Sequence, residues 1–119
     1  MLRIPFDPRK SADQSIQVLI PELQVVELRL VWNVRGSGWD ILVSNTSGVQ
    51  AGFFRLVPRT PLLLEHSALS PIAGDIIALP LTEGSVRDFT EYDALGDSWG
   101  LFWISPDDVK EWKAANGVG

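Results

Sequence analysis

A two-residue alternation of apolar and polar side chains over residues 26–43 constrains the fold of this chain more than any other feature. The apolar positions of its first run are Val26, Leu28, Leu30, Trp32 and Val34, and those of its second run are Trp39, Ile41 and Val43. A period of two is typical of a strand with one face inward. Between the runs stands Arg35-Gly36-Ser37-Gly38, whose glycines are expected to supply the positive φ of a tight hairpin.

The remaining segments predict further strands at 15–20, 49–57, 74–81 and 99–103, with a polar loop containing a short helical piece at 82–98. Pro80 suggests an edge position for its strand, because proline cannot donate to a ladder. Residues 1–13 are expected to form an arm anchored by Ile4 and Phe6. The chain is therefore predicted to be mainly β, a single domain over residues 1–119 in which a small antiparallel meander forms a barrel or a sandwich.

A short C-terminal helix is predicted at residues 105–116. Ser105 suits the N-cap, Pro106 the first helical position, and Asp107 and Asp108 the positive end of the helix dipole. Its apolar side is thin, so we expect it to lie on a surface or on a neighbouring subunit.

Composition excludes several classes of protein. Without cysteine, neither a disulfide framework nor a thiolate zinc site can form. The net charge is −5 and the ten Lys and Arg residues are scattered, which disfavours nucleic-acid binding. No apolar run is long enough to span a membrane, and the proline-bearing start lacks the apolar stretch of a signal peptide, so production in the cytosol is expected. The acidic excess lies late, at Glu83, Asp88, Glu91, Asp93, Asp97, Asp107, Asp108 and Glu111.

Catalytic, metal and cofactor sites are not predicted. Gly96-Asp97-Ser98-Trp99-Gly100 matches a nucleophile elbow, but a loop precedes Ser98 and a strand follows it, whereas the elbow joins a strand to a helix. The order His66, Asp88, Ser98 matches that of a serine-protease triad. This chain, however, is too short for the two barrels that position such a triad. The carboxylates of residues 83–97 lack calcium-loop spacing, and residues 36–38 lack the third glycine of a dinucleotide loop.

Five tryptophans are many for a chain of 119 residues. Trp32 and Trp39 flank the hairpin and are expected in the core. Trp99, Trp103 and Trp112 fit the core or an interface equally well, because aromatic residues anchor both. An exposed aromatic platform for sugars is a third possibility.

Several of these segments together resemble the plug proteins of contractile-tail baseplates described in cyanophages. The resemblance spans residues 14–104. It rests on a strand ending in Trp32-Asn33, on Trp39 opening the next strand, on Pro61-Leu62-Leu63, and on a turn at Leu95-Gly96 before a final aromatic strand. The inserted Ala94 and the C-terminal helix depart from the family pattern.

The resemblance implies a non-enzymatic virion component without a cofactor, which closes the distal end of the tail tube at the hub and spike until DNA ejection. Hub, spike and tube proteins and further copies of itself, three or six in all, would be its partners. Two other hypotheses remain open from the residues alone. One is a β-sheet module that binds carbohydrate or peptide through exposed tryptophans, and the other is a hydrolase using Ser98 and His66.

Overall fold

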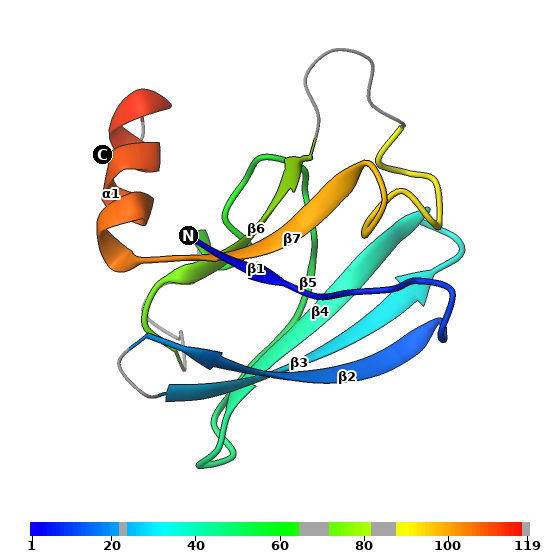
Figure 1. The fold of residues 1–119 in the computed structure, drawn as a ribbon, viewed down its shortest axis with the longest axis horizontal. Helices are drawn as coiled ribbons and strands as arrows, with labels where there is room; N and C mark the ends of the chain where they lie inside the picture. Colours follow the sequence, from blue (N-terminus) through cyan, green and yellow to red (C-terminus); the bar gives the residue numbers. More distant parts are fainter. Residues whose placement is uncertain (22–23, 65–71, 82–87, 118–119) are drawn as a thin grey trace.

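Two antiparallel sheets and one helix make up the fold (Figure 1). The computed structural model describes residues 1–21, 24–64, 72–81 and 88–117. The four-stranded sheet has the order β2 (Asp13–Ile20), β3 (Gln24–Asn33), β4 (Gly38–Asn45) and β5 (Gln50–Arg55). The three-stranded sheet has the order β1 (Leu2–Ile4), β7 (Trp99–Ile104) and β6 (Asp75–Pro80), and the helix α1 (Pro106–Ala115) follows β7.

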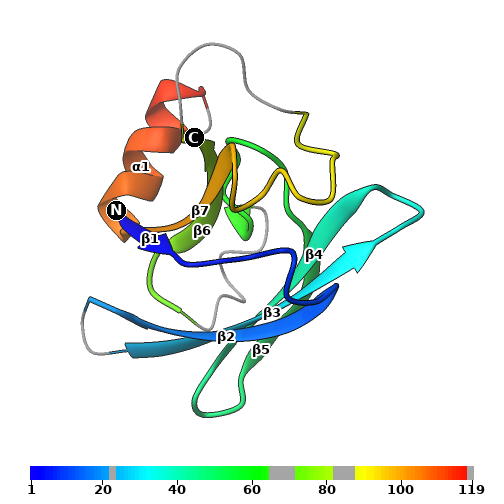
Figure 2. The same cartoon turned by 45° about the vertical axis from the view of Figure 1, so that its right-hand side comes forward.

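The two sheets face each other and enclose the core, as the turned view shows (Figure 2). The prediction of a mainly β fold with a C-terminal helix is confirmed. Of the two architectures considered, the sandwich is consistent with the structure, whereas a barrel is not, since the sheets remain separate and each keeps its own edge strands. Apolar side chains from both sheets fill the space between them.

The alternation that predicted β3 and β4 correctly identifies their inward face. The side chains on this face are almost fully buried. Six of them are at most 1 % exposed, namely Val26, Leu28, Leu30, Trp39, Ile41 and Val43. The pattern fails only at the hairpin end, where Trp32 is half-buried and Val34 is 79 % exposed. The last hydrogen-bonded pair joins Asn33 to Gly38, so Val34 belongs to the turn and no longer follows the pleat.

The glycines of this hairpin serve a different purpose from the one expected. Ser37, with φ of 49°, takes the left-handed conformation, and neither glycine of the turn does. Gly36 and Gly38 instead leave room for the Arg55 side chain, since a Cβ on Gly36 would lie 2.5 Å from its Nη2 atom. Arg55 crosses the turn to donate to the Gly36 carbonyl at 3.0 Å and to Asp40 at 2.7 Å.

The N-terminal arm contains a strand that the sequence did not predict. Leu2 pairs with Trp103 and Ile4 with Leu101, which makes β1 an edge of the smaller sheet. The predicted anchors are confirmed, because Ile4 is 2 % exposed and Phe6 packs against the core. From β1 the arm crosses to the start of β2 and thus ties the two sheets together (Figure 1).

The C-terminal helix forms as its capping residues predicted. The Ser105 side chain accepts from the backbone N–H of Asp108, and the Asp108 carboxylate accepts from the N–H of Ser105, which completes a capping box. Pro80 ends β6 at the margin of its sheet, also as predicted. Residues 88–98 form successive turns and no helix, and the rest of the predicted helical loop, 82–87, lies outside the described residues.

Candidate functional site

Two of the residues that carry the family resemblance, Trp32 and Trp39, lie at the hairpin end of β3 and β4. Trp32 and Trp39 pair across β3 and β4 with ring centroids 5.5 Å apart. Phe6 from the arm meets the Trp39 ring edge-on at 5.0 Å, and Tyr92 meets the Trp32 ring edge-on at 5.2 Å. These four side chains form what we call the aromatic cluster, and they join three segments that are distant in sequence. Edge-on aromatic pairs add to the stability that burial provides.

Asn33, the second residue of the Trp-Asn motif, shapes the hairpin. Its Oδ1 accepts from the backbone N–H of Gly36 at 3.1 Å, and its Nδ2 lies 3.4 Å from an Asp40 carboxylate oxygen. An asparagine at this position satisfies a backbone donor that the turn leaves unpaired. The motif therefore has a structural role at the β3–β4 turn.

The Leu95-Gly96 turn holds the N-terminal arm against the sandwich. Leu95 is 1 % exposed, and Gly96 has φ of 96°, a conformation that favours glycine. A Cβ on Gly96 would lie 2.5 Å from the Phe6 carbonyl oxygen, so the arm passes directly over this residue. The Tyr92 hydroxyl donates to the Pro8 carbonyl at 2.6 Å and gives the arm a second attachment.

Ser98 lies in the context that the sequence predicted, a turn followed directly by a strand. Its carbonyl accepts from the Leu81 N–H at 2.8 Å, and β7 begins at the next residue. The Asp88 carboxylate accepts from both the N–H and the hydroxyl of Thr90, and these bonds lower the pKa of Asp88 below its usual value. His66 lies outside the described residues. Over the described part of the chain, no three acidic or histidine side chains gather where they could hold a metal ion.

The structure buries most of the tryptophan surface within this one chain. Trp99 is 7 % and Trp103 is 4 % exposed, so core packing accounts for both. Trp103 donates from Nε1 to the Ala73 carbonyl at 2.8 Å. Trp112 on α1 is half-buried and donates to the Arg59 carbonyl at 2.9 Å, which fastens the helix to the loop after β5. None of the five tryptophans is exposed, so these residues do not form a flat platform for a sugar ring.

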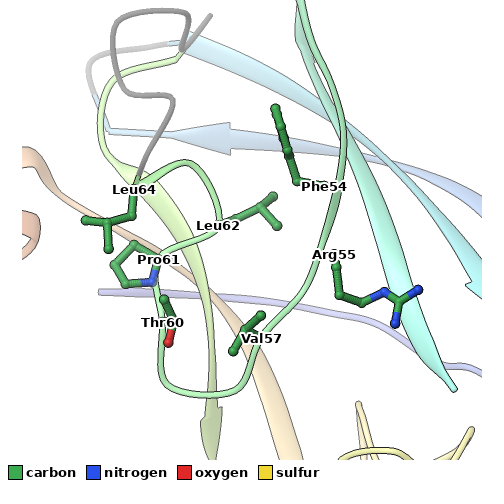
Figure 3. A pocket seen from close by; sticks show the side chains of 7 residues that line it. All are labelled: Phe54, Arg55, Val57, Thr60, Pro61, Leu62 and Leu64. Atoms are coloured by element: carbon green, nitrogen blue, oxygen red, sulfur yellow. The ribbon is translucent and has the colours of Figure 1, made fainter. Parts of the chain in front are cut away.

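A cavity of about 230 Å³ lies between β5 and the loop that follows it. Figure 3 shows Phe54 and Leu62 facing each other across this space, while the Arg55 side chain points away. The remaining lining residues are mainly apolar, at Val57, Thr60, Pro61 and Leu64. The cavity is small and lacks the converging polar groups that orient a substrate.

Asp75 is the one buried carboxyl among the described residues. It is 4 % exposed and accepts from the Leu63 N–H at 3.0 Å and from the Ile76 N–H at 2.7 Å. Burial raises the pKa of Asp75 to about 6, although the two backbone bonds and the Lys113 ammonium oppose the rise. The bond to Leu63 fixes the loop before β6. The only sequence signal for this role is an aspartate that opens an apolar strand.

Four exposed carboxylates stand on the turns before β7. We call this the acidic loop, residues 88–98, and it contains neither Lys nor Arg. Its exposed acidic residues are Asp88, Glu91, Asp93 and Asp97. Half of the eight acidic residues noted near the C-terminal end of the sequence thus lie on this one segment. Exposed carboxylates on this segment disfavour the approach of a polyanion.

Comparison with known proteins identifies the family. No helix in the described ranges is long and apolar enough to cross a membrane. None of the curated proteins compared with the chain matches it. The model of the family described as cyanophage baseplate Pam3 plug gp18 matches residues 1–107, which include both sheets and end in the first turn of α1. The resemblance drawn from the motifs is thereby confirmed. The chain belongs to this family of phage baseplate plug proteins, which are structural components of the tail.

Proposed function

We propose that this protein is a non-enzymatic part of the baseplate that closes the distal end of the tail tube, at the hub and spike, until DNA ejection. The observation that carries the proposal is the family match over residues 1–107, which covers the whole sandwich. The proposed partners are hub, spike and tube proteins and further copies of the chain. Three or six copies suit an axis where sixfold tube symmetry meets a threefold spike.

The packing of the sandwich suits a part that must keep its shape under load. The two sheets share one continuous core, and the Leu95-Gly96 turn and the aromatic cluster clamp the arm across their end. A close-packed interior has low compressibility and transmits force without yielding. Such a body can block a channel mechanically and needs no reactive group.

The negative charge of the chain suits a protein that lies next to DNA and must not bind it. The net charge is −5, and the acidic loop concentrates negative charge on one exposed segment. We propose that the acidic loop faces the lumen of the tube. There it would repel the phosphate backbone and leave the plug free to be released when the sheath contracts.

Imaging assembled particles by electron cryomicroscopy tests this proposal. Particles carrying the protein are compared with particles from which its gene is deleted, and the deletion is complemented with the wild-type gene as the control. We expect density on the tail axis at the distal end of the tube that is absent from the deletion and absent after contraction. Density at the baseplate periphery, or density that stays in place in contracted tails, would contradict the plug role.

The structure does not favour the two rival hypotheses. A carbohydrate-binding module needs exposed rings, and all five tryptophans are buried or half-buried. We expect tryptophan fluorescence to stay unchanged on titration with oligosaccharides. Esterase activity that disappears on Ser98→Ala would restore the enzymatic hypothesis.

A further inference from the structure

The middle of the open edge of β2, residues 14–20, lacks the features that normally protect an edge strand. β2 is the outermost strand of the four-stranded sheet, and the views show no strand beyond it (Figures 1 and 2). Residues 14–20 contain no charged side chain, no proline and no glycine. Natural sheets usually blunt their edges with such residues, because an unprotected edge recruits another strand.

The opposite margin of the same sheet shows that protection. In β5, Gly52 has φ of 91°, which interrupts a regular extended edge. Arg55 places a charge at the end of the strand and is paired with Asp40, and Pro58 follows shortly after. β2 also has an ion-paired charge at one end, Asp13 with Arg29, and a proline directly after it, Pro21, so the two margins differ in the uncharged run between them, residues 14–20.

The backbone of β2 directs alternate residues toward its open edge. The Ala12 carbonyl accepts from the Trp32 N–H at 2.8 Å, so even-numbered residues bond to β3. In an antiparallel ladder the intervening residues direct their N–H and C=O groups to the other side. For Ser15, Gln17 and Leu19, no hydrogen bond from the described residues engages these groups.

A groove lies beside the first half of this edge. Its volume is about 600 Å³, and it lies between the N-terminal arm and the first half of β2. The arm contributes Pro5, Phe6, Asp7 and Lys10, and β2 contributes residues 14–17. Inside the margin, Ile16 and Val18 are only half-buried, although they pack against the core. A strand along β2 would complete their burial.

We propose that the free protein pairs through β2 with β2 of a second copy, antiparallel and about a twofold axis. The charge-free segment, residues 14–20, is centred on Gln17, so an antiparallel match of the whole segment places Gln17 opposite its own copy. Ile16 then lies opposite Val18 on the inner face, and Ser15 lies opposite Leu19 on the outer face. A chain with net charge −5 repels its copies, and contact along an uncharged strand reduces that repulsion. This inference goes beyond the proposed function and does not depend on it.

Single cysteines test the contact and its register, because the chain has no cysteine of its own. In the proposed pair, Cys at position 17 faces its copy with Cα atoms about 5.5 Å apart, within disulfide reach. Ser15→Cys is the matched control, since positions 15 of the two copies would be roughly 14 Å apart. We expect mild oxidation to convert Gln17→Cys to a covalent dimer at least tenfold faster than Ser15→Cys. Equal rates, or faster cross-linking of Ser15→Cys, would overturn the proposal.

Sedimentation of the wild-type chain and two lysine variants gives an independent test. We expect wild type to sediment as a dimer of 13.1 kDa chains at micromolar concentration. Gln17→Lys opposes two ammonium groups across the axis and should weaken association about fivefold or more. Gln50→Lys, on the protected edge, should leave the dimer intact, and circular dichroism checks that both variants fold. A monomeric wild type, or equal weakening by both variants, would refute β2 pairing while leaving the location of the plug untouched.

Discussion

Replacing Asp75 by Asn should change how the stability of this protein depends on pH. Asp75 is buried beneath the loop before β6, and its carboxylate accepts from the backbone N–H groups of Leu63 and Ile76. Its pKa is raised to about 6 from an ordinary value of 3.8, mainly because burial disfavours the charged form. Asparagine has nearly the same shape and cannot ionise.

The sign and size of the effect follow from proton linkage. The folded protein holds the Asp75 proton more tightly than the unfolded chain does. The stability that protonated Asp75 contributes is therefore fully present below pH 3.8 and is lost as the pH rises to about 6. At 1.36 kcal/mol per pH unit, the difference between these two pKa values corresponds to ~3 kcal/mol. Any weakening of the bonds from Leu63 and Ile76 in the variant acts similarly at every pH and largely cancels from this comparison.

The assay is urea unfolding of wild type and Asp75→Asn at several values between about pH 3.5 and pH 7.5, where this carboxyl changes charge. We expect the free energy of unfolding of the variant to gain ~3 kcal/mol relative to wild type across this range. Asp88→Asn is a control that should leave the pH dependence nearly unchanged over this range. The pKa of Asp88 is lowered by its bonds from Thr90, so any stability that it contributes is present at neutral pH and is lost as the pH falls below 3.8. Parallel curves for wild type and Asp75→Asn would refute the reasoning.

Three further substitutions test the clamps on the arm and on the helix by chemical denaturation. Gly96→Ala combines a left-handed backbone with a Cβ against the Phe6 carbonyl, and should cost about 2 kcal/mol or more; a neutral result would mean that the arm does not pass there. Trp112→Phe removes the bond to the Arg59 carbonyl and should cost about 1 kcal/mol, with faster hydrogen exchange confined to α1. Ser105→Ala removes the N-cap at a similar cost of about 1 kcal/mol, whereas Ser105→Asp, which can still cap, should restore most of it.

The sequence predicted those elements whose local signals agree with their tertiary environment. The hairpin of β3 and β4 is one, because a single alternation sets both the strand and its inward face. The helix α1 is another, because its cap, its proline and its acidic first turn are all local. The strand β1 was missed because three residues are too few to show a period. It exists through its pairing with β7, which stands about a hundred residues away in the sequence.

The roles of individual residues were harder to predict where they depend on a distant neighbour. Gly36 was assigned a conformational role, yet it leaves room for Arg55. Trp99 and Trp103 suited the core and an interface equally by sequence, and the fold buries both, Trp99 beside Phe89 and Arg59 and Trp103 against Ala73. Asp75 drew no attention, because only the position of the Leu63 N–H shows why a carboxylate lies in the core. Each of these depends on contacts between segments that pattern and spacing do not encode.

The motifs on which the family resemblance rests describe the fold of this chain and say little about its contacts. Trp39 and Leu95 are buried, and Asn33 and Gly96 shape turns, so these four can contribute little to a partner's surface. Contacts with neighbouring baseplate proteins must therefore be sought on the exposed surface, namely the open edge of β2, the acidic loop and α1. The helix lies almost wholly beyond residue 107, where the family match ends, and none of its residues is buried. Contact of a neighbouring protein with the exposed face of α1 would therefore be a feature of this chain that the family match does not predict.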